Sequence, residues 1–133
     1  MNALLVVDAS AVVAALTGGG DRRGVEATRQ MAGAGLVAPD IIGYEVFNAL
    51  RGLRSGKKIS RSQAQRALDD WRRLDVERWP LEIVEERTWE LTDAMTAYDA
   101  AYVALAERLD VPLLTADGRL ARASGGRAEI LVV

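Results

Sequence analysis

The sequence predicts an α/β protein with a central, mainly parallel sheet covered by helices on both faces. Short runs of apolar, β-favouring residues recur at 3–7, 35–39 and 111–117. Segments with the apolar spacing of helices lie between them, and this alternation of strand and helix is typical of parallel sheets. No internal repeat, low-complexity block or long linker interrupts the 133 residues, so we expect one domain over residues 1–133.

The first forty residues predict a strand, two helices and a second strand. Residues 3–7 are apolar throughout, which indicates a short buried strand, and residues 9–16 predict the helix that follows. Three glycines at 18–20 interrupt the chain before a second helical stretch at 21–34. The segment GLVAP at 35–39 predicts a brief strand that its proline closes.

Two helices joined by a short basic turn come next. Asp40 is a candidate cap for a helix that runs to about residue 53, and Gly56 lies at its expected C-terminus. Ser60 and Gln63 have the spacing of a capping box, which predicts the start of a helix that ends near residue 74. The stretch RSGKK between the two helices predicts a turn.

The second half of the chain returns to alternating strands and helices. The segment YDAAYVALA carries one charge in nine residues, which indicates a helix buried on most sides. We expect a strand at 76–80, a helix at 82–95, the apolar helix at 98–109, a strand at 111–117, a helical turn at 118–123 and a final strand at 128–133.

The composition excludes several kinds of chemistry. The chain has no cysteine, so disulfides, thiolate metal sites and cysteine nucleophiles are excluded. It has no histidine either, which excludes a Ser-His-Asp triad and the usual zinc ligand sets. The net charge of −2 provides no whole-chain basicity for binding nucleic acid. The N-terminal apolar run lacks a basic flank and is too short for a signal peptide or a membrane span, so we expect a cytoplasmic protein.

Four acidic residues fall at one edge of the predicted sheet, where strands end and helices begin. Asp8 and Asp117 lie at the carboxyl ends of two strands. Glu45 lies in the second turn of the helix after residue 39, and Asp99 lies in the first turn of the apolar helix. Ligands of open parallel sheets bind outside this edge, so the four carboxylates form a candidate site.

Each of these acids also has an explanation that needs no site. Asp8 could cap the helix that begins at residue 9, and Asp117 precedes a glycine in a turn-favouring pair. Glu45 lies about 80° from the centre of the apolar stripe of its helix, a position that suits a solvated surface acid. Asp99 follows Thr96 by three residues, as in a capping box, although an acid is costly in so apolar a helix unless it has a partner.

Taken together, the four acids indicate a metal site. Crowded carboxylates repel one another, and some must stay protonated unless a cation neutralises them. Oxygen ligands without histidine or cysteine select Mg²⁺ or Mn²⁺ over zinc. An ion held in this way can activate a water for attack on phosphate, so the predicted chemistry is phosphodiester hydrolysis.

Four stretches of the sequence resemble the PIN-domain nucleases, and among them the VapC-type toxins of bacterial VapBC toxin–antitoxin pairs. These stretches are VVDASAVVA, APDIIGYEVFNAL, TAYDAAYVALAERLDVPLLTAD and GRL, in this order. The resemblance extends from residue 4 to residue 132 in length, order and spacing. It implies a PIN-like three-layer fold. It also implies that Asp8 and Asp99 are the core metal ligands and that Glu45 and Asp117 complete the acidic pocket, directly or through water.

The neighbours of the acids fit the same resemblance in part. Ser10 and Thr115 match small hydroxyl residues that would orient carboxylates or water, although a helix cap and a strand-end hydroxyl explain them equally well. Some PIN relatives carry a further acid just after the last one, and Gly118 and Arg119 stand there instead, which weakens the case for a second metal. Arg119 or Arg122 could face a phosphate, although surface arginines are usually only solvated.

The activity that the resemblance implies is that of an endoribonuclease toxin dependent on Mg²⁺ or Mn²⁺. Its substrate would be structured RNA such as tRNA or rRNA. The resemblance also implies inhibition by a small cognate VapB-like antitoxin and a homodimer of the toxin, with no membrane partner.

The densest basic region of the sequence lies between residues 51 and 73. Its first part follows the helix of Glu45 and could carry an RNA backbone to the acids, although a solvated helical hairpin explains it equally well. In a complex with an antitoxin, the same hairpin would form part of a groove for a peptide helix. The candidate RNA-binding residues are Arg51, Arg54, Lys57, Lys58 and Arg61.

Two other small Mg²⁺-binding folds fail on particular residues. A phosphatase of the haloacid dehalogenase type needs a second aspartate at position 10, which is Ser10, and a distal lysine. A response-regulator receiver needs a lysine late in the chain, whereas both lysines of this chain lie at 57 and 58. An alternative of another class is a catalytically silent PIN fold that serves as a binding or scaffold module. The complete set of four acids argues against it.

Overall fold

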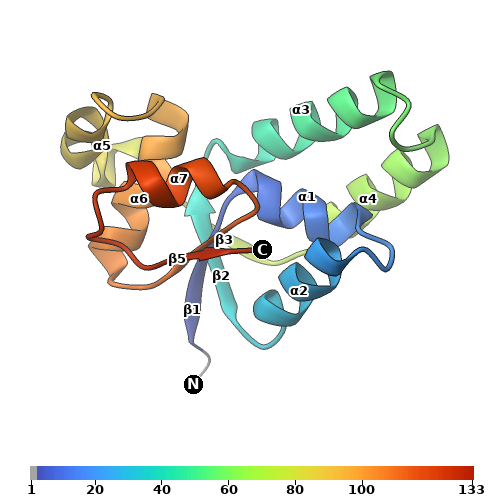
Figure 1. The fold of residues 1–133 in the computed structure, drawn as a ribbon, viewed down its shortest axis with the longest axis horizontal. Helices are drawn as coiled ribbons and strands as arrows, with labels where there is room; N and C mark the ends of the chain where they lie inside the picture. The colour runs from blue at the N-terminus through green and yellow to red at the C-terminus, as the bar shows by residue number, and fades with distance from the viewer. Residues whose placement is uncertain (1–2) are drawn as a thin grey trace.

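A computed structural model describes residues 3–133 and places a five-stranded sheet between two layers of helices (Figure 1). Every pairing in the sheet is parallel, and the strand order is β3-β2-β1-β4-β5. The α/β class and the parallel sheet expected from the sequence are therefore confirmed. The strands are β1 (Leu4–Val7), β2 (Gly35–Pro39), β3 (Val76–Trp79), β4 (Leu113–Thr115) and β5 (Ile130–Val132).

Helices connect the strands and cover both faces of the sheet. In Figure 1, α1 and α2 lie on one side of the sheet and α5 and α6 lie on the other, which makes three layers. The helices are α1 (Ala9–Thr17), α2 (Arg22–Met31), α3 (Ile42–Ser55), α4 (Arg61–Arg73), the 3₁₀ turn η1 (Leu81–Ile83), α5 (Glu85–Leu91), α6 (Ala97–Leu109) and α7 (Gly118–Ala123).

The hydrophobic core forms around β1, the central strand. Val6 and Val7 are fully buried because the sheet is covered on both faces. Residues 100–106 of α6 are buried without exception, as the low polarity of this helix predicted. On the opposite side, α1 packs against α2 at Gly18 and Gly24, where a Cβ on Gly24 would lie 2.5 Å from the Cα atom of Gly18.

The start of α3 differs from the sequence prediction. Asp40 does not cap this helix, which begins at Ile42 without any side-chain cap. The backbone N–H of Asp40 instead donates to the carbonyl of Trp79, so the residue extends the pairing of β2 with β3. This later start moves Glu45 from the expected second turn of the helix into its first turn.

The prediction of a single helix at 82–95 was also wrong. The structure divides this segment into η1 and α5, because the backbone of Val84 has φ of −127°, outside the helical range. Residues 92–96 then leave the helix, and Thr96 adopts the extended conformation with which it caps α6. The caps predicted at Gly56 and Ser60, with the capping box to Gln63, are confirmed.

The strand order places the ends of β1 and β4 at a switch point of the sheet. From β1 the chain builds outward through β2 to β3, and it then returns to the other side of β1 to form β4 and β5. Crevices in open α/β sheets form outside the carboxyl ends of strands at such a point. Any ligand of this sheet is therefore expected beyond Val7 and Thr115.

The hairpin of α3 and α4 extends away from the sheet (Figure 1). Its turn contains Lys57, which has a left-handed backbone with φ of 57°. Within residues 3–133, no helix combines the length and the apolar character that crossing a bilayer requires.

Candidate functional site

Asp8 lies directly after β1 and has two structural roles. Its Oδ1 atom accepts a hydrogen bond from the backbone N–H of Ala11 at 2.9 Å, so the residue caps α1. Oδ1 also accepts from the Ser10 hydroxyl at 2.6 Å, and Oδ2 accepts from the Thr115 hydroxyl at 2.5 Å. Cap and site were alternatives in the sequence, and the structure shows that a single carboxylate makes both sets of contacts.

Hydroxyl groups connect the ends of β1 and β4. The Ser10 hydroxyl accepts from the backbone N–H of Ala116 at 2.9 Å, and the Thr115 hydroxyl accepts from that of Asp117 at 3.0 Å. Each hydroxyl has one hydrogen to donate, and both donate it to Asp8. The two hydroxyls named from the sequence therefore lie together and orient Asp8.

Glu45 on α3 lies near Asp8 and Asp99, whose charges act on it, and it is half-buried rather than solvated as its helical position suggested. We refer to this end of the sheet, with its four acids, as the acidic crevice. The hydroxyl of Tyr102 donates to its Oε1 atom at 2.6 Å. Tyr102 lies on α6 and is only 1% exposed. Sequence reasoning missed this residue, although its spacing of three from Asp99 places both side chains on one face of the helix.

Asp99 and Asp117 come from the starts of α6 and α7. The backbone N–H of Asp99 donates to the Thr96 hydroxyl at 3.2 Å, so the predicted cap exists. The Thr96 side chain also lowers the pKa of the Asp99 carboxyl, against the larger rise that burial causes. Asp117 caps α7 by accepting from the backbone N–H of Arg119 at 3.0 Å. The Arg119 guanidinium also donates to both carboxylate oxygens, with Nε 3.1 Å from Oδ1 and Nη2 3.0 Å from Oδ2.

The four carboxylates influence one another electrostatically. Burial raises the pKa of Asp8, and the negative charge of Asp99 adds to that rise. Burial also raises the pKa of Glu45, with further increases from the charges of Asp99 and Asp8. For Asp99, burial and then the charge of Asp117 raise the pKa. Asp117 is the exception, because its hydrogen bonds to Arg119 lower its pKa.

The donor atoms in this crevice are suited to a hard divalent cation. All four side chains offer oxygen, the ligand atom that such cations prefer, and burial and then neighbouring negative charge raise the pKa of three of them. Among residues 3–133, however, no three acidic side chains are already close enough together to hold an ion. A cation would therefore have to draw the carboxylates inward and compete with Arg119 for Asp117.

The basic residues named from the sequence occupy two places. Four of them line a hollow at the turn of the α3–α4 hairpin that contains no acidic residue, namely Arg54, Lys57, Lys58 and Arg61. Arg51 lies one turn earlier on α3. Within the described part of the chain, none of these five residues forms an ion pair, whereas Arg72 and Arg73 pair with Asp69 and Asp70. Arg119 lies on Asp117, and Arg122 is exposed on α7.

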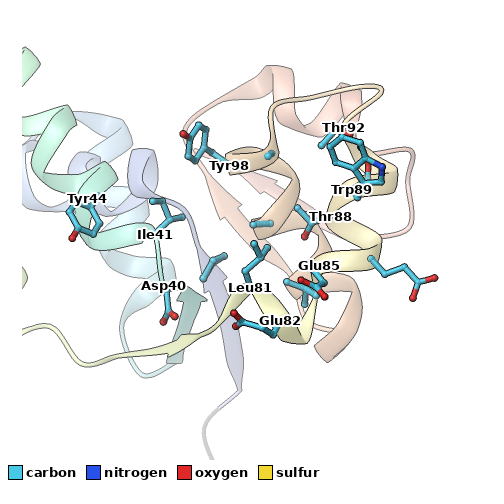
Figure 2. Close-up of a pocket in the computed structure, with 15 residues that line it drawn as sticks. Asp40, Ile41, Tyr44, Leu81, Glu82, Glu85, Thr88, Trp89, Thr92 and Tyr98 are labelled. Atoms are coloured by element: carbon cyan, nitrogen blue, oxygen red, sulfur yellow. The ribbon is translucent and has the colours of Figure 1, made fainter.

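A cavity of about 800 Å³ lies beside the acidic crevice, between the starts of α3 and α6 and the helix α5 (Figure 2). We call it the α3–α5 groove. Tyr44 and Tyr98 line this groove, and the acids Glu45 and Asp99 directly follow them in the sequence. The groove and the acidic crevice therefore share the starts of α3 and α6. Its apolar lining includes Ile41, Tyr44, Leu81, Trp89 and Tyr98, and its acidic lining includes Asp40, Glu82, Glu85 and Glu86.

Comparisons with known proteins match nearly the whole chain. The PIN domain family model matches residues 5–126. Ribonuclease VapC9 of Mycobacterium tuberculosis is 40% identical over 130 residues, which is 98% of this chain and 98% of that protein.

Two solved structures share the fold. VapC20 of Mycobacterium tuberculosis, a sarcin-ricin loop cleaving toxin, has a TM-score of 0.65 and 20% identity over 90% of this chain and 94% of its own. VapBC2 from Rickettsia felis, bound to a DNA fragment from its promoter, has a TM-score of 0.64 and 14% identity. The match covers 97% of this chain and 98% of the VapBC2 chain. At these identities the likeness is one of fold alone.

Proposed function

This chain belongs to the PIN domain family, and we propose that it is a VapC-type endoribonuclease toxin that uses Mg²⁺, or Mn²⁺ in its place, to cleave structured RNA such as tRNA or rRNA. The observation that carries the proposal is the gathering of Asp8, Glu45 and Asp99 outside the switch point of the sheet. Three carboxylates with raised pKa values in one crevice are costly to the fold unless a cation neutralises them. The ribonuclease relative over nearly the full length supports RNA as the substrate.

In this proposal, Asp8 and Asp99 hold the ion, and Glu45 and Asp117 complete its surroundings directly or through water. The ion would supply neutralisation of the scissile phosphodiester and a more acidic water for attack on phosphorus. Ser10 and Thr115 fix the orientation of Asp8 through the hydrogen bonds described above.

The remaining residues of the crevice orient groups or handle protons. Tyr102 holds Oε1 of Glu45 and leaves Oε2 without a donor among the described residues, so that oxygen can face the reacting groups. The chain contains no histidine to act as a general acid, and in this proposal water would protonate the leaving oxygen.

The decisive experiment incubates purified, antitoxin-free protein with total cellular RNA in Mg²⁺ or Mn²⁺. We expect discrete fragments that disappear with EDTA and with the Asp99→Asn variant. Mapping the fragment ends identifies the cleaved RNA. Intact RNA with both metals, from a folded sample, would contradict the proposal and favour a silent scaffold.

We also propose that a cognate VapB-like antitoxin inhibits the nuclease in the cytoplasm, where its RNA substrates are. The 40% identity to ribonuclease VapC9 over nearly the full length supports this partner, because VapC-type toxins are paired with VapB antitoxins. Co-expression with the antitoxin gene should yield a co-purifying complex that does not cleave RNA, and release of the antitoxin should restore cleavage. A complex that cleaves as fast as the free protein would contradict this role.

A homodimer that pairs through the α3–α5 groove is the third part of the proposal. Trp89 is 78% exposed and Tyr44 is 80% exposed, and a second copy would cover these side chains. Sedimentation velocity should show a dimer for the wild type and a monomer for Trp89→Glu. The control Val25→Glu changes another exposed apolar residue, on α2, and should stay dimeric. A dimer that survives Trp89→Glu would exclude the groove as the interface.

A further inference from the structure

We propose that Arg119 is an internal counter-ion of the acidic crevice, which occupies Asp117 in the metal-free protein and competes there with the divalent cation. The inference rests on the proposed metal-dependent function and concerns how the site is regulated. In this inference Arg119 weakens metal binding, whereas its sequence position suggested a solvated side chain or a contact with phosphate.

The geometry is that of a two-point ion pair. Nε and Nη2 of Arg119 each donate to a different oxygen of Asp117, at 3.1 and 3.0 Å. Such bidentate contacts are the most specific that arginine makes with a carboxylate. The positive charge of Arg119 also acts on Asp99, where it partly offsets the rise in the pKa of the carboxyl. The guanidinium therefore lies where positive charge serves two of the four acids.

The arrangement is specific to this one residue. Within residues 3–133, Arg119 is the only cationic residue that forms an ion pair with any of the four carboxylates. Arg122 lies one turn further along α7, and its charge acts on Asp117 without a hydrogen bond. Arg119 thus tests the effect of direct contact with Asp117, and Arg122 tests the effect of a nearby positive charge without contact.

Exchange between Arg119 and a metal is structurally easy. The Arg119 side chain is 82% exposed, so it can move into water without disturbing the core. Asp117 would stay in place, because its Oδ1 keeps the backbone N–H of Arg119 and its own N–H keeps the Thr115 hydroxyl. Exposed ion pairs are weak, so the competition should change metal affinity by a factor of about two to five.

The experiment measures Mn²⁺ affinity by titration with detection of free Mn²⁺ by electron paramagnetic resonance, at constant ionic strength and without RNA. We expect Arg119→Gln to bind Mn²⁺ about two- to five-fold more tightly than the wild type. Arg122→Gln removes the same charge from the same helix and should change the affinity less. In an Asp117→Asn background, Arg119→Gln should have a much smaller effect, because only its action on Asp99 is left.

Two outcomes would overturn the inference. Equal gains in Arg119→Gln and Arg122→Gln would mean that only net charge matters. Weaker binding in Arg119→Gln would mean that the arginine supports the site instead of competing for it. A wild type that binds no Mn²⁺ at all would instead remove the proposed metal site itself, so failure of the inference and failure of the proposed function are distinguishable.

Discussion

At Asp99, the demands of folding and of the proposed metal site oppose each other. Asp99 lies at the start of the most deeply buried helix, and both burial and the charge of Asp117 raise its pKa. What the fold requires of Asp99 is met by its backbone, whose N–H donates to the Thr96 cap. The variant Asp99→Asn, which puts a neutral amide of the same shape in this place, should therefore keep the fold and lose the activity.

We predict that Asp99→Asn lowers RNA cleavage by a factor of about a hundred or more, because metal ions supply several kcal/mol of transition-state stabilisation. The same variant should unfold at a higher temperature than the metal-free wild type at pH 7, because the repulsion among the carboxylates is relieved. Cleavage assays and thermal melts check the two parts.

The charge control for this prediction is Asp93→Asn. Asp93 lies in the exposed turn between α5 and α6, and its charge is not among those that act on the four carboxylates, so its variant loses one negative charge without changing the site. It should leave both cleavage and the melting temperature close to those of the wild type. Full activity in Asp99→Asn would remove Asp99 from the site.

Tyr102 is the residue that most clearly links the core to the crevice. We predict that Tyr102→Phe weakens Mn²⁺ binding by about tenfold, because partners that orient metal ligands typically matter to that extent. The ring should stay in place, and the loss of one hydrogen bond to a carboxylate should cost about 1–2 kcal/mol of stability. Titration with Mn²⁺ and urea unfolding measure the two effects.

The matched control for this prediction is Tyr98→Phe. Tyr98 lies on the same helix but is 59% exposed, and its hydroxyl makes no hydrogen bond to the described residues. Its variant should keep the wild-type affinity for Mn²⁺. If Tyr102→Phe binds Mn²⁺ as tightly as Tyr98→Phe does, the hydrogen bond to Glu45 has no role in positioning the site.

At the scale of elements, the α3–α4 hairpin carries acidic and basic residues at opposite ends of α3. Acids gather where α3 begins, and unpaired basic residues gather where it ends. A helix of 14 residues spans about 20 Å, so an RNA that contacts both ends must extend well beyond the cleaved bond.

We predict that changing Lys57, Lys58 and Arg61 together to glutamine weakens RNA binding. The slope of log affinity against log salt should become shallower by about two, because each phosphate contact contributes about 0.7. Filter binding at several salt concentrations measures this slope. Arg72→Gln with Arg73→Gln is the control, since these residues are already paired with acids on α4. An unchanged slope in the triple variant would place the RNA path elsewhere.

The same scale shows where sequence reasoning succeeds and where it stops. The strands around β1 and the helix α6 were predictable because their apolar patterns are strong and local. The division of residues 82–95 into η1 and α5 was not predictable, since it depends on the backbone of Val84 and on the cap at Thr96. Placing all four acids at one sheet edge was predictable from topology. The contacts of Tyr102 and Arg119 were not, because both depend on side-chain packing in three dimensions.

For the whole molecule, the raised pKa values make stability depend on pH. A carboxyl whose pKa is higher in the folded state stabilises the fold when protonated, and that contribution is lost as the pH rises through the folded-state pKa. Asp8, Glu45 and Asp99 all shift in this direction from ordinary values of 3.8, 4.5 and 3.8. The lowered pKa of Asp117 acts in the opposite direction.

We predict that the metal-free protein gains stability as the pH is lowered from about 7 through the raised pKa values of these three carboxyls. The stabilisation caused by Asp99→Asn should be largest at about pH 7 and should shrink as the pH falls through the raised pKa of the Asp99 carboxyl, because the wild-type group is then protonated too. Urea unfolding of both proteins across this range, in EDTA, measures the difference. A gain that is independent of pH would show that Asp99 is not under electrostatic strain.

The pairing of β1 with β4 has a consequence for the synthesis of this protein. The hydroxyl of Thr115 reaches Asp8 across 107 positions of the chain, and Asp117 follows it. Chains fold from the N-terminus as they leave the ribosome. A nascent chain therefore carries Asp8 and Glu45 for most of its translation without the residues that complete the crevice. Any product that terminates before β4 would be unable to cleave RNA.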